Sequence, residues 1–146
     1  MKYTLTSHIN NVADFMIGAK QEVPPGQTVP SPEVRILRAK LIYEECMETI
    51  EALGVDHIMG QFVDAGEKHY NSKKVLDGVG DTSVVSVGTL IACGLSYVYP
   101  EALERIDINN LSKVGPGAIW REDGKLLKPP GYVPVDLTDL IEVKNG

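Results

Sequence analysis

Acidic side chains recur at helical spacing in two separate stretches of the chain. Residues 41–52, "LIYEECMETIEA", hold four glutamates: Glu44, Glu45, Glu48 and Glu51. Residues 76–92, "LDGVGDTSVVSVGTLIA", begin with Asp77 and Asp81 and carry no other charge. Hard oxygen ligands without His or Cys suit Mg²⁺ or Mn²⁺. The two stretches together therefore predict a divalent-cation site.

The glutamates of the first stretch do not share one face of a helix. At about 100° per residue, the apolar positions fall in one arc and predict a core stripe: Ile36, Ala39, Ile42, Tyr43, Cys46, Met47, Ile50 and Leu53. Glu51 lies opposite that stripe beside Lys40, which predicts a solvent-exposed carboxylate. Three acids share the remaining face with two leucines: Glu44, Glu45, Glu48, Leu37 and Leu41. Taken alone, that face fits a mixed surface and an inward-facing acid cluster equally well.

The second acidic stretch decides between these two interpretations. Asp77 and Asp81 lie on one helix face, and small apolar residues continue it. Asp81 lies too far into the helix for the helix dipole to explain it. Acids such as Glu44 and Glu48 repel each other, and burial would raise that cost unless a cation lay between them. Packing the two helices acid face to acid face collects four or five carboxylates, and the number of cations they hold stays open.

Capping residues and glycines predict where the helices begin and end. We expect helices over 7–20, with Ser7 as N-cap, over 32–53, over 73–94 and from about 99. A proline-rich connection separates the first two helices, and residues 55–72 are ambiguous. Residues 114–146 predict an irregular Gly/Pro-rich tail with "REDGK" as a turn. The expected fold is a single all-α domain over 1–146, a four-helix-type bundle.

Composition excludes some classes of partner. The net charge of −6 and pI of about 5.0 argue against nucleic acid. The uncharged stretch over 82–100 contains serines, threonines and glycines, so we expect a buried helix and not a membrane span. The N-terminus lacks the apolar region of a signal peptide, which favours a cytoplasmic protein.

Four segments in order resemble one family. "RAKLIYEECMETIEA" resembles the R-x-x-L-I-x-E-E-x-x-E segment of the all-α nucleoside triphosphate pyrophosphohydrolases, the MazG-like and phosphoribosyl-ATP pyrophosphohydrolase-like superfamily. "DGVGDTSVVSVGTLIACGL" resembles its second acidic helix, "INNLSKV" its S-N-x-S-K segment, and "DGKLLKPPGYVPVDL" the tail of small bacterial and phage-type members. The chain departs from the family's E-x-x-D motif, because Gly78 stands at the glutamate position and Asp77 supplies the acid one residue earlier.

The resemblance implies hydrolysis of a (deoxy)nucleoside triphosphate to the monophosphate and pyrophosphate. It also implies a Mg²⁺ or Mn²⁺ cofactor and a homodimer or dimer-of-dimers tetramer. The expected metal ligands are Glu45, Glu48, Asp77 and Asp81. Glu44 is expected to orient or deprotonate the attacking water, a role that Glu45 or Glu48 could exchange with it. The expected substrate-binding residues are Arg38, Asn110, Lys113, Lys125 and Lys128.

Other functions remain open from the sequence. One is phosphoribosyl-ATP pyrophosphohydrolase activity, and another is a non-catalytic helical interaction protein stabilised by a metal. A ferritin-like di-iron site would need E-x-x-H pairs, which the sequence lacks. For the base, dGTP or another purine is slightly favoured over dCTP or dUTP.

Overall fold

The computed structural model describes residues 2–141 and divides into two compact units, residues 1–96 and 97–146, which are described separately. Residues 2–141 form four α-helices and four short strands in two antiparallel hairpins. The expected all-α fold is therefore wrong, because two small sheets accompany the helices. The single domain over 1–146 remains a prediction.

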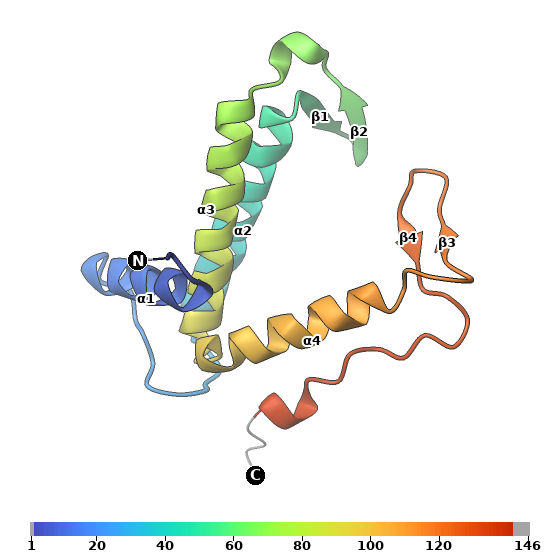
Figure 1. Ribbon diagram of the computed structural model, residues 1–146. Helices are drawn as coiled ribbons and strands as arrows, with labels where there is room; N and C mark the ends of the chain where they lie inside the picture. The colour runs from blue at the N-terminus through green and yellow to red at the C-terminus, as the bar shows by residue number, and fades with distance from the viewer. Residues whose placement is uncertain (1, 142–146) are drawn as a thin grey trace. The chain divides into compact units, whose positions relative to one another are not determined.

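Three helices build the first unit: α1 (Leu5–Gly18), α2 (Pro32–Ala52) and α3 (Ser72–Ala92). Ser31 caps α2 as expected, because its hydroxyl accepts a hydrogen bond from the Val34 N–H at 3.3 Å. The α1 cap is Thr4, which accepts from the Ser7 N–H at 3.1 Å, so the prediction of Ser7 as N-cap is wrong. Figure 1 shows α2 and α3 running side by side, and α1 packs against α3.

A β-hairpin occupies the segment that the sequence left ambiguous. Strands β1 (Val55–Ile58) and β2 (Gln61–Asp64) pair antiparallel, and a short 3₁₀ helix, η1 (Glu67–His69), follows. Met59 and Gly60 form the turn with φ of 50° and 78°. Two positive φ values characterise the tight turns that suit the twist of a hairpin. Asn or Asp usually precedes the glycine, so Met59 makes the signal weak in sequence.

The buried residues of the first unit other than glycine lie where α3 meets α1 and α2. They are Val12, Met16, Ala52, Val85, Val87, Ile91 and Ala92, together with Arg38. The expected core stripe on α2 is wrong, because Ile36, Tyr43 and Leu53 are 57%, 65% and 46% exposed. Arg38 and Thr49 mark the side of α2 that faces α3. Tyr43 lies about 120° around the helix from that side.

By length and composition alone, α3 is one helix within residues 2–141 that could cross a membrane. Core helices of water-soluble proteins pass the same test. Here α3 packs against both α1 and α2, and its apolar residues Val85, Val87 and Ile91 are buried there. The expectation of a buried helix agrees with this packing.

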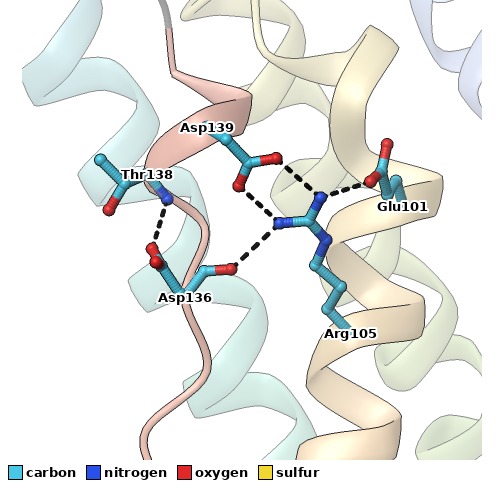
Figure 2. Close-up of polar contacts among 5 residues, drawn as sticks. All are labelled: Glu101, Arg105, Asp136, Thr138 and Asp139. Atoms are coloured by element: carbon cyan, nitrogen blue, oxygen red, sulfur yellow. Dashed lines mark hydrogen bonds and ion pairs between the residues drawn. The ribbon is translucent and has the colours of Figure 1, made fainter.

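The second unit contains α4 (Tyr99–Leu111), strands β3 (Ile119–Trp120) and β4 (Leu126–Leu127), and the 3₁₀ helix η3 (Thr138–Leu140). The predicted "REDGK" turn joins β3 to β4, with the Arg121 N–H donating to the Lys125 carbonyl at 2.7 Å. Figure 2 shows how η3 is attached to α4. Arg105 donates to both carboxylate oxygens of Asp139, at 2.6 and 2.8 Å, and also to Glu101.

Candidate metal and nucleotide site

The carboxylate of Glu45 is the centre of the acidic site. Glu45 is half-buried, and its Oε2 atom is buried without a hydrogen-bond partner in the described part of the chain. Burial raises the pKa of Glu45, and four neighbouring negative charges raise it further: Glu48, Asp81, Glu44 and Asp77. Four of the acids that the sequence singled out therefore act on the fifth, Glu45.

A close approach of α2 and α3 brings these acids together. The Thr49 hydroxyl donates to the Glu45 carbonyl at 2.7 Å and lies 3.5 Å from the Thr82 hydroxyl. On the facing helix, a Cβ atom at Gly78 would lie 2.5 Å from the Thr49 Oγ1. Any side chain at position 78 would therefore collide with Thr49.

A large pocket of about 720 Å³ lies at the end of α2 and the start of α3, within the first unit. Five acids contribute to its lining: Glu48, Glu51, Asp56, Asp77 and Asp81. Lys68, His69 and Lys74 contribute basic groups from η1 and α3. Neither lysine forms an ion pair within residues 2–141. The pocket therefore places unpaired cations and unpaired anions around a space large enough for a polyphosphate.

The sequence analysis missed Lys68, His69 and Lys74 as site residues. They belong to "EKHYNSKK", residues 67–74, which lies between the two acidic stretches. This run of basic residues directly before Asp77 was the available signal. Because residues 55–72 had no assigned structure, nothing in the pattern indicated that the run turns back toward the acids.

A smaller pocket of about 280 Å³ lies among α1, α2 and α3. Its walls are mostly apolar: Val12, Phe15, Met16, Leu41, Val84 and Val85, with Gly88. Its polar groups are Gln21, Arg38, Glu45 and Asp81. Asp81 lines both this pocket and the larger one. The two pockets therefore adjoin at one acid of the predicted metal site.

Arg38, expected to bind substrate, is a buried residue that lines the smaller pocket. Arg38 is only 6% exposed to solvent. Nε donates to Thr89 at 3.3 Å, Nη1 to Gln21 at 3.2 Å and Nη2 to the Val85 carbonyl at 2.9 Å. Burial lowers the pKa of Arg38 from its ordinary value. These bonds hold the guanidinium group in one orientation.

The other predicted substrate-binding residues lie in the second unit. Lys113 donates to Asn110 at 2.9 Å, and both Lys113 and Lys128 hold their Nζ atoms over the Tyr132 ring, at 5.3 and 5.6 Å from its centre. Asn110, Lys113 and Lys128 therefore gather at Tyr132. Lys125 lies in the turn after β3, where its N–H donates to Asp123. The structure shows no contact of the Lys125 side chain with this group among the described residues.

The acids have the right chemistry for a hard divalent cation, but they are not closed around one. Within residues 2–141, no three His, Cys, Asp or Glu side chains already form a group that could hold a metal ion. The acids around Glu45 offer only hard carboxylate oxygens, which suit Mg²⁺ and Mn²⁺. The unpartnered Oε2 of Glu45 supplies a buried acceptor for such an ion. Binding would therefore draw these side chains inward.

No protein-family model matches the chain, and no curated protein matches it. The family resemblance therefore stays a prediction. The function has to be argued from the acids, the two pockets and the residues that line them.

Proposed function

We propose that this protein hydrolyses a (deoxy)nucleoside triphosphate to the monophosphate and pyrophosphate with Mg²⁺ or Mn²⁺. The observation that carries the proposal is the unpartnered, buried Glu45 oxygen, together with the four carboxylates whose negative charge raises the pKa of Glu45. A buried carboxylate near other negative charges is costly unless a cation neutralises it. The adjoining pockets suit the two chemically different ends of a nucleotide, one polar and one largely apolar.

Glu45, Glu48, Asp77 and Asp81 are the residues that would hold the cation. A divalent ion bound there would supply a Lewis acid that polarises the α-phosphoryl group. The residues themselves position the anionic substrate only through that ion, because like charges would otherwise repel it. Removing the metal should therefore weaken triphosphate binding as well as hydrolysis.

Glu44 is the group proposed to take the proton from water. It is exposed on the helix beside Glu45, so water reaches it freely. The water oxygen forms a bond to the α-phosphorus, and the bond from that phosphorus to the bridging oxygen breaks. Pyrophosphate leaves with the bonding electron pair, and the water proton passes to the carboxylate. Glu45 can exchange this role with Glu44.

Lys68, His69 and Lys74 are proposed to steady the β- and γ-phosphates in the larger pocket. Charge developing on the leaving pyrophosphate is stabilised best by cations already in position. The lysines have no acidic partner within residues 2–141, so phosphate oxygens would not have to displace one. Asn110, Lys113, Lys125 and Lys128 remain proposed substrate-binding residues of the second unit.

Exposed apolar side chains on α2 and on α3 support a homodimer. Ile36 and Tyr43 lie seven residues apart on α2, and Leu76 and Val79 lie on α3, with exposures of 57%, 65%, 77% and 55%. Exposed apolar side chains on a helix are typical of a protein interface. A second copy that covered those of one helix with an equivalent helix pair would complete a four-helix arrangement.

The decisive experiment is a hydrolysis panel with Mg²⁺ or Mn²⁺. It should contain all canonical ribo- and deoxynucleoside triphosphates and phosphoribosyl-ATP, the substrate of the rival activity. Release of pyrophosphate with the matching monophosphate is the expected result. Orthophosphate as the product would move cleavage to the γ-phosphate. No product from any substrate, with folded protein, would exclude the enzyme.

A further inference from the structure

We infer that the smaller pocket binds the nucleotide base and that Gln21 selects bases carrying a carbonyl group, such as uracil, thymine or guanine. This inference rests on the proposed function, because it assigns the base end of the same substrate. It makes Gln21 a specificity-determining residue and Arg38 the residue that positions it. It also favours dUTP, dTTP and dGTP over dCTP and dATP.

The shape and lining of the smaller pocket suit a planar heterocycle. A volume of about 280 Å³ accommodates a single base but not a whole nucleotide. Phe15, Leu41 and Val84 supply apolar walls, and few polar groups reach the space. The larger pocket shares Asp81 with this one. A base in the smaller pocket therefore leaves its phosphates beside the acids.

Arg38 determines which end of the Gln21 amide remains free. A guanidinium group has only N–H donors, so the amide must turn its oxygen toward it. Arg38 Nη1 donates to Gln21 Oε1 at 3.2 Å, and its other bonds, to Thr89 and Val85, prevent it from turning away. The backbone N–H of Gln21 is already used as well, because it donates to the Met16 carbonyl at 2.8 Å. The amide NH₂ of Gln21 is therefore the group left to meet a ligand.

An amide NH₂ discriminates between the two kinds of base edge. It donates to the O4 of uracil or thymine and to the O6 of guanine. Opposite the N4 amino group of cytosine or the N6 amino group of adenine, two donors would face each other and lose a hydrogen bond. Glu45 and Asp81, which line the same pocket, are acceptors, but the proposed cation engages them. The expected preference is roughly tenfold or more.

The closest test compares uracil with cytosine, which differ at one exocyclic position. We would measure kcat/KM for dUTP and dCTP, and binding of dUMP and dCMP by calorimetry with Mg²⁺. The binding readout does not depend on hydrolysis. The same measurements would be made on the Gln21→Glu variant. This substitution replaces the free NH₂ with a second acceptor oxygen, while Arg38 keeps its partner. We expect the uracil preference of the native protein to disappear or invert in this variant.

Gln61→Glu is the matched control, because Gln61 is exposed on β2 and lines neither pocket. It should keep the native preference. If Gln21→Glu does not fold, Gln21→Met, which lacks both donor and acceptor, should remove the preference.

The outcomes separate this inference from the proposed function. Hydrolysis of dUTP and dCTP at equal rates, with equal binding of dUMP and dCMP, overturns the base assignment but not the proposed hydrolase activity. Selective binding of dUMP without hydrolysis of any triphosphate supports the base pocket and overturns the proposed hydrolase activity. A preference for dUMP that persists in Gln21→Glu overturns the role of Gln21. Failure to bind any nucleotide overturns both proposals.

Discussion

The guanidinium group of Arg38 fills the space that a side chain on Gly88 would need. A Cβ atom at position 88 would lie 2.3 Å from Arg38 Nη2 and 3.1 Å from its Cζ. The absence of that atom lets Arg38 reach the Val85 carbonyl from across the helix pair. With Nη2 held at Val85, the other terminal nitrogen of Arg38, Nη1, donates to Gln21 and orients its amide. A glycine on α3 thus supports the arrangement of polar groups in the smaller pocket.

Gly88→Ala should destabilise the first unit. The added methyl group collides with Arg38, and moving Arg38 would break its hydrogen bonds to Thr89, Gln21 and Val85, so we expect a loss of about 1–3 kcal/mol in the free energy of unfolding. Urea denaturation measures it. Gly80→Ala is the matched control, because Gly80 lies in the same helix and a Cβ there meets nothing within 4 Å. The control should be neutral or stabilising. Equal stability of both variants would contradict the packing.

Glu45→Gln should stabilise the metal-free protein near neutral pH. The pKa of Glu45 is raised in the folded state, so ionisation of this carboxyl group disfavours folding. The penalty is absent below the ordinary glutamate pKa, appears as pH rises through that value, and is complete above the raised value. Thermal unfolding at several pH values should show a higher midpoint for the variant at pH 7, with the difference vanishing near pH 4.

Glu104→Gln, at an exposed position of α4, should show no such pH-dependent difference. Mg²⁺ should raise the midpoint of the native protein more than that of Glu45→Gln. A neutral-pH midpoint unchanged by Glu45→Gln would contradict the crowding of charges around this residue.

Glu48→Gln and Asp81→Asn should each abolish turnover while the protein stays folded. Each substitution removes a charged ligand and keeps a side chain of nearly the same size, so packing is preserved. Pyrophosphate release and circular dichroism check the two parts of this prediction. Retained activity in both variants would remove these residues from the metal assignment.

The double variant Lys68→Ala/Lys74→Ala should lower kcat/KM for the triphosphate by roughly tenfold or more. Both ammonium groups line the larger pocket, and their loss should leave binding of Mg²⁺ unchanged. Lys73→Ala is the matched control, since Lys73 is exposed next to Lys74 but does not line that pocket. Equal kinetics for the control and the double variant would exclude the pocket as the phosphate site.

Val79→Glu should convert a homodimer into a monomer. A charge on the exposed apolar face of α3 would be buried without a partner in the proposed interface. Light scattering after gel filtration measures the mass. Ile17→Glu changes an apolar residue of similar exposure, 61%, on α1 and should leave the mass unchanged. A native protein that is already monomeric would contradict the dimer.

The positions of the helices could be predicted from the sequence better than the way in which the helices pack. Ser31, Pro32 and Gly54 are local signals, and α2 begins and ends where they indicate. The direction that α2 faces is not a local property. Its apolar stripe indicated a core, yet the side facing α3 carries Arg38 and Thr49, because the small residues Gly78 and Gly88 of α3 receive them.

The candidate site was predictable in its acids and not in its walls. Glu45 and Asp81 were recognisable because carboxylates on otherwise apolar helix faces are unusual. Lys68 and Lys74 reach the same pocket through a hairpin whose turn, at Met59, has little signal in the sequence. Gln21 follows α1 in a proline-rich connection, and only the bond from Arg38 shows its importance.

The hairpin between the acidic helices is closed at its base. Leu53 and Tyr70 form a β-bridge, and the Asn71 N–H donates to the Ala52 carbonyl at 2.9 Å. These contacts join the end of α2 directly to the start of α3, whatever lies between them. The tip of the hairpin is therefore a tolerant insertion point, where relatives could gain or lose residues, or an engineer could graft a reporter peptide, without changing the spacing of the carboxylates.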